Sequence, residues 1–123
     1  MKAQLKNYRQ SPRKVRLVAN LIKGKPVQRA LLLLDTTPKR ATGTLKKMLE
    51  SAIANAQQQQ TGMENLFIKE IRVDKGITLH RSMPRAHGRA FRIDKHTSNV
   101  IVVLEEKEQK PKTKTKKTNK KSE

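Results

Sequence analysis

Residues 71–104 read IRVDKGITLHRSMPRAHGRAFRIDKHTSNVIVVL and carry the clearest structural signal in the chain. The first part of this stretch alternates apolar with polar side chains, as a half-buried strand does. The apolar positions are Ile71, Val73, Ile77 and Leu79. The last part, residues 97–104, is rich in β-branched residues and also predicts a strand. Because Pro84 and Gly88 between the two parts favour a turn, we predict one β-hairpin at about residues 66–104.

The distal part of this hairpin, residues 80–96, is strongly basic. Its charged residues are Arg81, Arg85, Arg89, Arg92 and Lys95, with Asp94 as the acid. Arms of about 15–20 residues, at ~3.3 Å per residue, would extend roughly 50 Å. An isolated two-stranded ribbon is only marginally stable in water, and repulsion between cations weakens it further. We therefore expect folded RNA to supply the layer that this ribbon lacks.

The N-terminal half predicts a short strand followed by three helices. Ser11 and Pro12 are typical of an N-cap with proline at the first helical position, and Gly24 would end the helix that begins there. Val15, Val18, Ala19 and Ile22 form the apolar stripe of this helix. We expect the strand and the three helices at residues 2–9, 12–23, 26–34 and about 39–59.

The composition points to a polyanionic partner. The chain holds 29 Lys and Arg against 10 Asp and Glu, a formal net charge of +19, and such a surplus disfavours compaction in isolation. Its aromatic residues are Tyr8, Phe67 and Phe91, too few for the serial base stacking of single-strand binders. Contacts to phosphate are then the main source of affinity.

Several functions are excluded by what the sequence lacks. The absence of cysteine rules out disulfides, zinc ribbons and thiol nucleophiles. The longest apolar runs, residues 30–34 and 100–104, are far shorter than the ~20 residues that span a bilayer. No apolar region follows Met1 and Lys2, so we expect no secretory signal. Residues 108–123 are lysine-rich and predict a disordered tail, which leaves residues 1–107 as one body that includes the hairpin.

The tip segment, residues 83–90, combines cations with small side chains. Ala86 and Gly88 let the backbone approach a phosphate ridge, while Arg85 and Arg89 can fork onto phosphate oxygens or stack on bases. The alternative is a flexible, solvated loop, but such loops rarely hold so many arginines without acids. The segment therefore favours contact with RNA.

The first predicted helix carries a second group of cations, formed by Arg13, Lys14, Arg16 and Lys23. An ordinary solvated face is the alternative interpretation. No acid lies between Lys2 and Lys25, so ion pairs within the helix do not account for these cations. RNA contact is again the favoured interpretation.

The three histidines, His80, His87 and His96, all lie in the hairpin. Their spacing of seven and nine residues matches no usual metal-ligand pattern. Asp74 and Asp94 could form a phosphodiesterase pair with them, but an exposed ribbon offers no pocket that shifts a pKa or excludes water. We therefore expect no metal, no cofactor and no enzymatic activity.

Several separate motifs resemble bacterial large-subunit ribosomal protein twenty-two, in order, over about residues 1–104. The motifs are KVRLVA at 14–19, LIKGK at 21–25, LESAIANA at 49–56, VDKG at 73–76, the tip segment 83–90 and residues 97–104. The resemblance implies an α+β fold, with three helices packed on a small three-stranded antiparallel sheet and a long protruding β-hairpin. The elements expected from the residues agree with it.

The resemblance also implies a function. A protein of this family is a structural constituent of the large ribosomal subunit in the cytoplasm, binds several domains of the large-subunit RNA and assists early assembly. Its hairpin lines the nascent polypeptide exit tunnel, near the constriction shared with large-subunit protein four. We expect no homo-oligomer.

The site residues follow from the basic stretches and from the resemblance together. We expect RNA contacts at Lys2, Lys6, Arg9, Arg13, Lys14, Arg16, Lys23, Lys25, Arg72, Arg81, Arg85, Arg89, Arg92 and Lys95. The tunnel-facing tip would be Met83, Pro84, Arg85, Ala86, His87, Gly88, Arg89 and Ala90.

Two positions depart from the family pattern. Asn20 stands where aspartate is common, and His87 stands where a larger basic side chain is frequent. The second departure puts in doubt any tip interaction that needs a permanent cation.

Two other functions stay open at this point. One is a DNA-bending architectural protein, because a basic β-arm with proline near its tip can wedge into a minor groove. The other is an RNA-processing enzyme that uses Asp74, Asp94 and the histidines.

Overall fold

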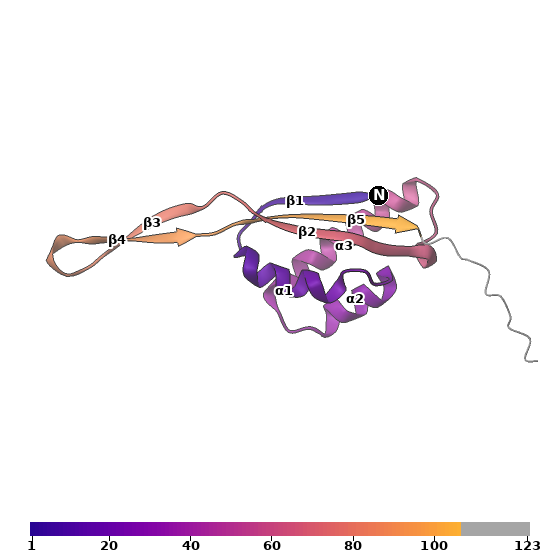
Figure 1. Cartoon of the computed structure of the whole chain (residues 1–123), viewed down its shortest axis with the longest axis horizontal. Helices are drawn as coiled ribbons and strands as arrows, with labels where there is room; N and C mark the ends of the chain where they lie inside the picture. Colours follow the sequence, from indigo (N-terminus) through magenta and orange to yellow (C-terminus); the bar gives the residue numbers. More distant parts are fainter. Residues whose placement is uncertain (107–123) are drawn as a thin grey trace, which may run out of the picture.

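The computed structural model describes residues 1–106, and the tail expected at residues 108–123 lies outside this range. The described chain is α+β, as predicted (Figure 1). Its elements are β1 (Lys2–Tyr8), α1 (Pro12–Ile22), α2 (Val27–Thr36), α3 (Arg40–Gln58), the 3-10 helix η1 (Met63–Asn65), β2 (Leu66–Lys75), β3 (Leu79–Pro84), the 3-10 helix η2 (Ala86–Gly88), β4 (Ala90–Lys95) and β5 (Ser98–Glu106).

A three-stranded antiparallel sheet forms the body, in the order β1-β5-β2. The central strand β5 alternates buried and half-buried residues from Ser98 to Leu104, and the buried ones are Ser98, Val100, Val102 and Leu104. Figure 1 shows α1, α2 and α3 together on one side of this sheet. The helices and the buried face of β5 therefore enclose one hydrophobic core.

Each helix buries the apolar stripe that its sequence period predicts. In α1 the buried residues include Val15, Val18, Ala19 and Ile22, the four positions predicted. In α3, Leu45 and Leu49 are almost fully buried. Burial of such aliphatic side chains stabilises the fold by about 1.5–3 kcal/mol each. The side chain of Ser11 makes no capping hydrogen bond, in contrast to its expected role, and its backbone carbonyl instead accepts from Lys14 and Val15.

The two outer strands of the body sheet are partly covered at their free edges. Gly24 has a φ of 73° and reverses the chain after α1. The backbone N–H of Gly24 donates to Ile68 of β2, and the N–H of Ile68 donates to Lys25, both at 3.0 Å. At the other edge, the Asn55 side-chain amide donates to the Lys2 carbonyl at 3.3 Å.

The predicted hairpin is not one continuous ladder, because the described chain has five strands in two sheets. The β2–β5 ladder ends at the pair Lys75 and Ser98, and a separate β3–β4 ladder begins at Leu79 and Lys95. We call residues 79–95 the arm. In Figure 1 the arm extends from one end of the body, past the helices.

The apolar alternation also loses its core partner at this break. Ile71 and Val73 are 7% and 6% exposed, whereas Ile77 and Leu79 are 64% and 36% exposed. Apolar side chains recur at Ile77 and Leu79, but none of α1, α2 and α3 covers the arm (Figure 1).

A close contact joins the arm to the body. The Gly76 N–H donates to the Thr97 carbonyl at 2.8 Å, and the Thr97 hydroxyl donates to the carbonyl of Ile77. Thr97 is 4% exposed. A Cβ atom at Gly76 would collide with the Thr97 hydroxyl and lie 3.3 Å from the Thr97 backbone. This junction therefore requires glycine for its space.

We predict that Gly76→Ala lowers the free energy of unfolding by about 1–3 kcal/mol, because the added methyl group forces the junction apart. Urea denaturation measures the change. Gly43→Ala in α3 is the matched control, because a Cβ there meets nothing within 4 Å. It should raise the free energy of unfolding by about 0.5–1 kcal/mol. Equal effects of the two substitutions would contradict the steric account.

Candidate nucleic-acid interface

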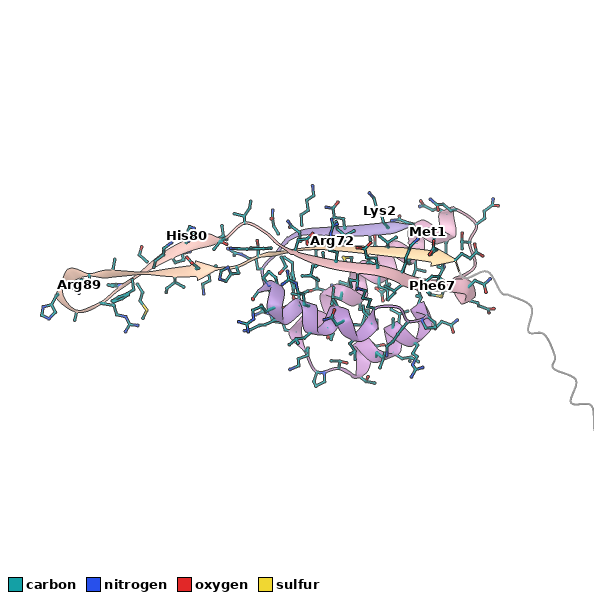
Figure 2. The ribbon with its side chains drawn as sticks, in the orientation of Figure 1. Met1, Lys2, Phe67, Arg72, His80 and Arg89 are labelled. Carbon is teal, nitrogen blue, oxygen red and sulfur yellow. The ribbon has the colours of Figure 1, made fainter. Side chains whose placement is uncertain are left out.

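The arm has no hydrophobic layer of its own. All six residues of β3 are exposed, and β4 contains one half-buried residue, Ile93, among five exposed ones. Six residue pairs join the two strands, from Leu79 and Lys95 to Pro84 and Ala90. Figure 2 shows His80 part-way along the arm and Arg89 at its far end. Every predicted contact residue of the arm is therefore accessible to a partner.

The tip segment is closed by a tight turn. The Arg85 N–H donates to the Arg89 carbonyl at 2.8 Å. His87 and Gly88 have φ angles of 60° and 67°, in the left-handed region that glycine adopts freely and a side-chain residue rarely does. The sequence indicated Gly88 as a turn residue but gave no sign of the left-handed conformation at His87.

Phe91 is a feature of the tip that the sequence reasoning did not include in the site. It pairs across the ladder with Met83, and the two side chains are 55% and 44% exposed. The Arg85 guanidinium carbon lies 5.6 Å from the Phe91 ring centroid, at cation–π distance. The tip therefore presents an exposed apolar surface beside its cations.

A three-residue polar cluster lies across the arm. His80 Nδ1 is 2.6 Å from Asp94 Oδ1, Arg92 Nε lies 3.2 Å from the same oxygen, and its guanidinium also contacts the His80 ring. The hydrogen bond to His80, with the charges of His80, Arg92 and His96, holds the pKa of Asp94 below its ordinary value. The negative charge of Asp94 is thus balanced by its neighbours. The side chains of His80 and Asp94 are each about half exposed.

The second aspartate considered for catalysis lies elsewhere. Asp74 is in β2 and forms an ion pair with Arg72 at 2.9 Å. Within residues 1–106, no three His, Asp or Glu side chains gather as a possible metal site, and no helix there is long and apolar enough to cross a membrane.

The cations of α1 do not all face solvent freely. Nε and one terminal nitrogen of Arg16 both donate to the carbonyl of Val73, at 3.1 and 2.9 Å. Arg16 therefore fastens α1 to β2, a role that the helical pattern does not predict. Arg13, Lys14 and Lys23 are exposed.

The other predicted cations lie at separate places on the body. Lys2, Lys6 and Arg9 are exposed in or just after β1, and Lys25 is half-buried in the loop before α2. Figure 2 places Lys2 in the half of the body that is farther from the arm and Arg72 near the middle of the body. Four predicted residues do come together, since Arg9, Lys14, Arg81 and Lys95 line one cavity at the base of the arm. Arg40 at the start of α3 completes this group and was not among the predicted residues.

Comparison with known proteins gives a consistent match. The sequence model of a family described as ribosomal protein L22p/L17e matches residues 3–105. A large ribosomal subunit protein uL22 of Syntrophotalea carbinolica is 49% identical over 107 residues, which cover 86% of this chain and 97% of the relative. The uL22 protein of Maridesulfovibrio salexigens is 50% identical over 106 residues, or 85% and 96%. That of Thermoanaerobacter pseudethanolicus is 52% identical over 100 residues, or 80% and 89%.

The polar cluster of the arm gives a prediction about acid titration. A carboxyl whose pKa is lowered by folding stabilises the folded state above its unfolded pKa of about 3.9, and this contribution is lost as the pH falls through the folded value. We expect the Asp94 carboxyl, followed by carbon-13 NMR, to titrate below about 3.9. His80→Ala should move the midpoint up toward that value, and His96→Ala should move it less. A midpoint unaffected by His80→Ala would contradict the assigned cause.

Proposed function

Because this chain belongs to the ribosomal protein L22p/L17e family, we propose that it binds folded large-subunit ribosomal RNA through its arm and the basic surface of its body. Members of the family are structural proteins of the large ribosomal subunit. The chain is therefore a structural ribosomal protein and not an enzyme. This assignment replaces both alternatives, the DNA-bending protein and the RNA-processing enzyme.

The observation that carries the proposal is the exposed, basic arm. A two-stranded sheet without a covering layer is marginal in water, and the arm adds mutual repulsion among its cations to this weakness. Neutralisation by phosphates relieves the repulsion and releases counterions, which favours binding. The acid of the arm is occupied by His80 and Arg92, so it does not offset this attraction.

The predicted RNA contacts fit this proposal in different degrees. Arg81, Arg85, Arg89 and Lys95 are exposed along the arm, and within residues 1–106 none of them forms an ion pair. Arg72 and Arg92 are paired with aspartates, and Arg16 is held by the Val73 carbonyl. We therefore propose that the unpaired cations supply most of the phosphate contacts.

We further propose that the tip segment faces the nascent polypeptide exit tunnel, close to large-subunit protein four, and that the body assists early subunit assembly. The tip suits a confined position because it is narrow. Its small residues Ala86, Gly88 and Ala90 leave the backbone accessible, and every residue from 83 to 90 is exposed. The nascent chain would then pass the Met83 and Phe91 pair.

Charge reversal at the tip tests this function. We expect Arg85→Glu with Arg89→Glu to reduce incorporation into large subunits, measured as the amount of protein that sediments with them, because the variant repels phosphate. In a salt titration of binding to large-subunit RNA, the log–log slope should fall by about two, because two phosphates are no longer neutralised.

The control is Arg29→Glu with Lys47→Glu, which changes the net charge equally at exposed positions that are not among the proposed RNA contacts. It should incorporate close to the wild-type level. Normal incorporation and an unchanged salt slope for the tip variant would refute the role of the tip.

A further inference from the structure

The base of the arm holds a concave basic site that combines side chains from the body and the arm. The cavity has a volume of about 670 Å³. The body contributes Arg9, Lys14 and Arg40, from the loop after β1, from α1 and from the start of α3, and the arm contributes Arg81 and Lys95. Figure 1 shows the chain passing from β1 into α1 close to the point where the arm leaves the body.

The site has a strong surplus of positive charge. Among the residues that the structure describes, Asp94 is the one acid in its lining, and the carboxylate contacts His80 at 2.6 Å and Arg92 at 3.2 Å. Within residues 1–106, none of the five cations of the cavity forms an ion pair. Five like charges held around one hollow repel one another unless an anion lies between them.

The wall that carries Arg9 is fixed to the sheet. The hydroxyl of Ser98, at the start of β5, donates to the Gln10 carbonyl at 2.5 Å, and the Gln10 N–H donates to Tyr8 at 2.8 Å. The wall formed by Arg81 and Lys95 of the arm is connected to the body through the hydrogen bonds between Gly76, Ile77 and Thr97. The body side of the cavity is therefore anchored in the core, and the arm side is anchored through the junction.

We propose that this cavity binds a backbone phosphate of the ribosomal RNA and that the phosphate clamps the arm to the body. The inference rests on the proposed function, because it names the group that would occupy one place on the RNA-binding surface. Arginine forks match the oxygens of a phosphate diester, which lysine contacts as a point charge. Since the cations come from both sides of the junction, one shared phosphate fixes the direction of the arm.

The first test counts phosphates. Binding to a transcript of large-subunit ribosomal RNA is measured against salt for the full chain, for Arg40→Gln, for Arg81→Gln and for the double variant. Each single substitution should lower the log–log slope by up to about one. The double substitution should lower it no further, because both side chains serve the same phosphate. Additive reductions of about two would overturn the shared clamp.

The matched control is Arg29→Gln, an exposed arginine of α2 away from the cavity, which should leave the slope unchanged. All the substituted side chains are exposed, and thermal unfolding followed by circular dichroism verifies that each variant folds. If Arg40→Gln and Arg81→Gln left the salt slope unchanged, as Arg29→Gln should, while the tip variants lowered it, the cavity proposal would be overturned and the proposed function would stand. A wild-type chain that does not bind the transcript would instead overturn the proposed function.

The second test measures the direction of the arm. The chain has no cysteine, so Ser82→Cys on the arm and Gln57→Cys on α3 provide two unique sites for spin labels. The distribution of label distances should narrow when the transcript binds the otherwise wild-type chain. It should narrow clearly less when Arg40→Gln and Arg81→Gln are added. Equal narrowing in both, or narrowing with an acidic protein in place of RNA, would overturn the clamp.

Discussion

The β3–β4 ladder leaves the body without an apolar layer on either face, and this constraint governs how the rest of the chain is used. Hydrogen bonds between two strands contribute little net stability when water competes for the same groups. The arm compensates only in part, through the contact of Arg85 with Phe91 and the cluster of His80, Arg92 and Asp94. Its full order therefore depends on a surface outside the chain, which the proposed function supplies as RNA.

The body supplies what the arm lacks. Val73 is the last well-buried apolar residue of β2 before the junction, and Arg16 from α1 holds the carbonyl of that residue. Beyond Val73, the hydrogen bond between Gly76 and Thr97 joins the two chain segments between the two sheets. Two part-buried hydrogen-bonded contacts thus link the core to the first residues of the arm.

Local pattern was enough to predict the elements of the body but not the division of the hairpin. The period of α1 gave its buried face correctly, and Pro12 gave its start, because both depend on neighbours in sequence. The alternation from Ile71 to Leu79 is interrupted at Lys75, where β2 ends. The pattern resumes at Ile77, so it did not reveal that helices cover only its first half. The junction depends on the fit of Gly76 against Thr97, which lies 21 residues further along the chain.

Prediction of the site from sequence was limited in the same way, because the contacts of its cations depend on residues distant in the chain. Cations along the arm could be predicted from composition, whereas the grouping of Arg40 with Arg81 required the tertiary fold. Arg16 was predicted as an RNA contact from its charge, and the backbone carbonyl that binds it is 57 residues distant in sequence. The exposure of Phe91 could not be predicted from the periodicity of the sequence. It follows from the position of this residue in the arm, which lies beyond the core.

The loop after α1 has a consequence for the chain before it meets any ribosome. By pairing with Ile68, residues 24 and 25 occupy backbone groups on the outer edge of β2 that a strand from another molecule would otherwise use. Open sheet edges of this kind template aggregation. A newly synthesised copy is thereby protected from edge-to-edge pairing with other copies of the chain. At the arm, repulsion between the clustered positive charges disfavours the same kind of association.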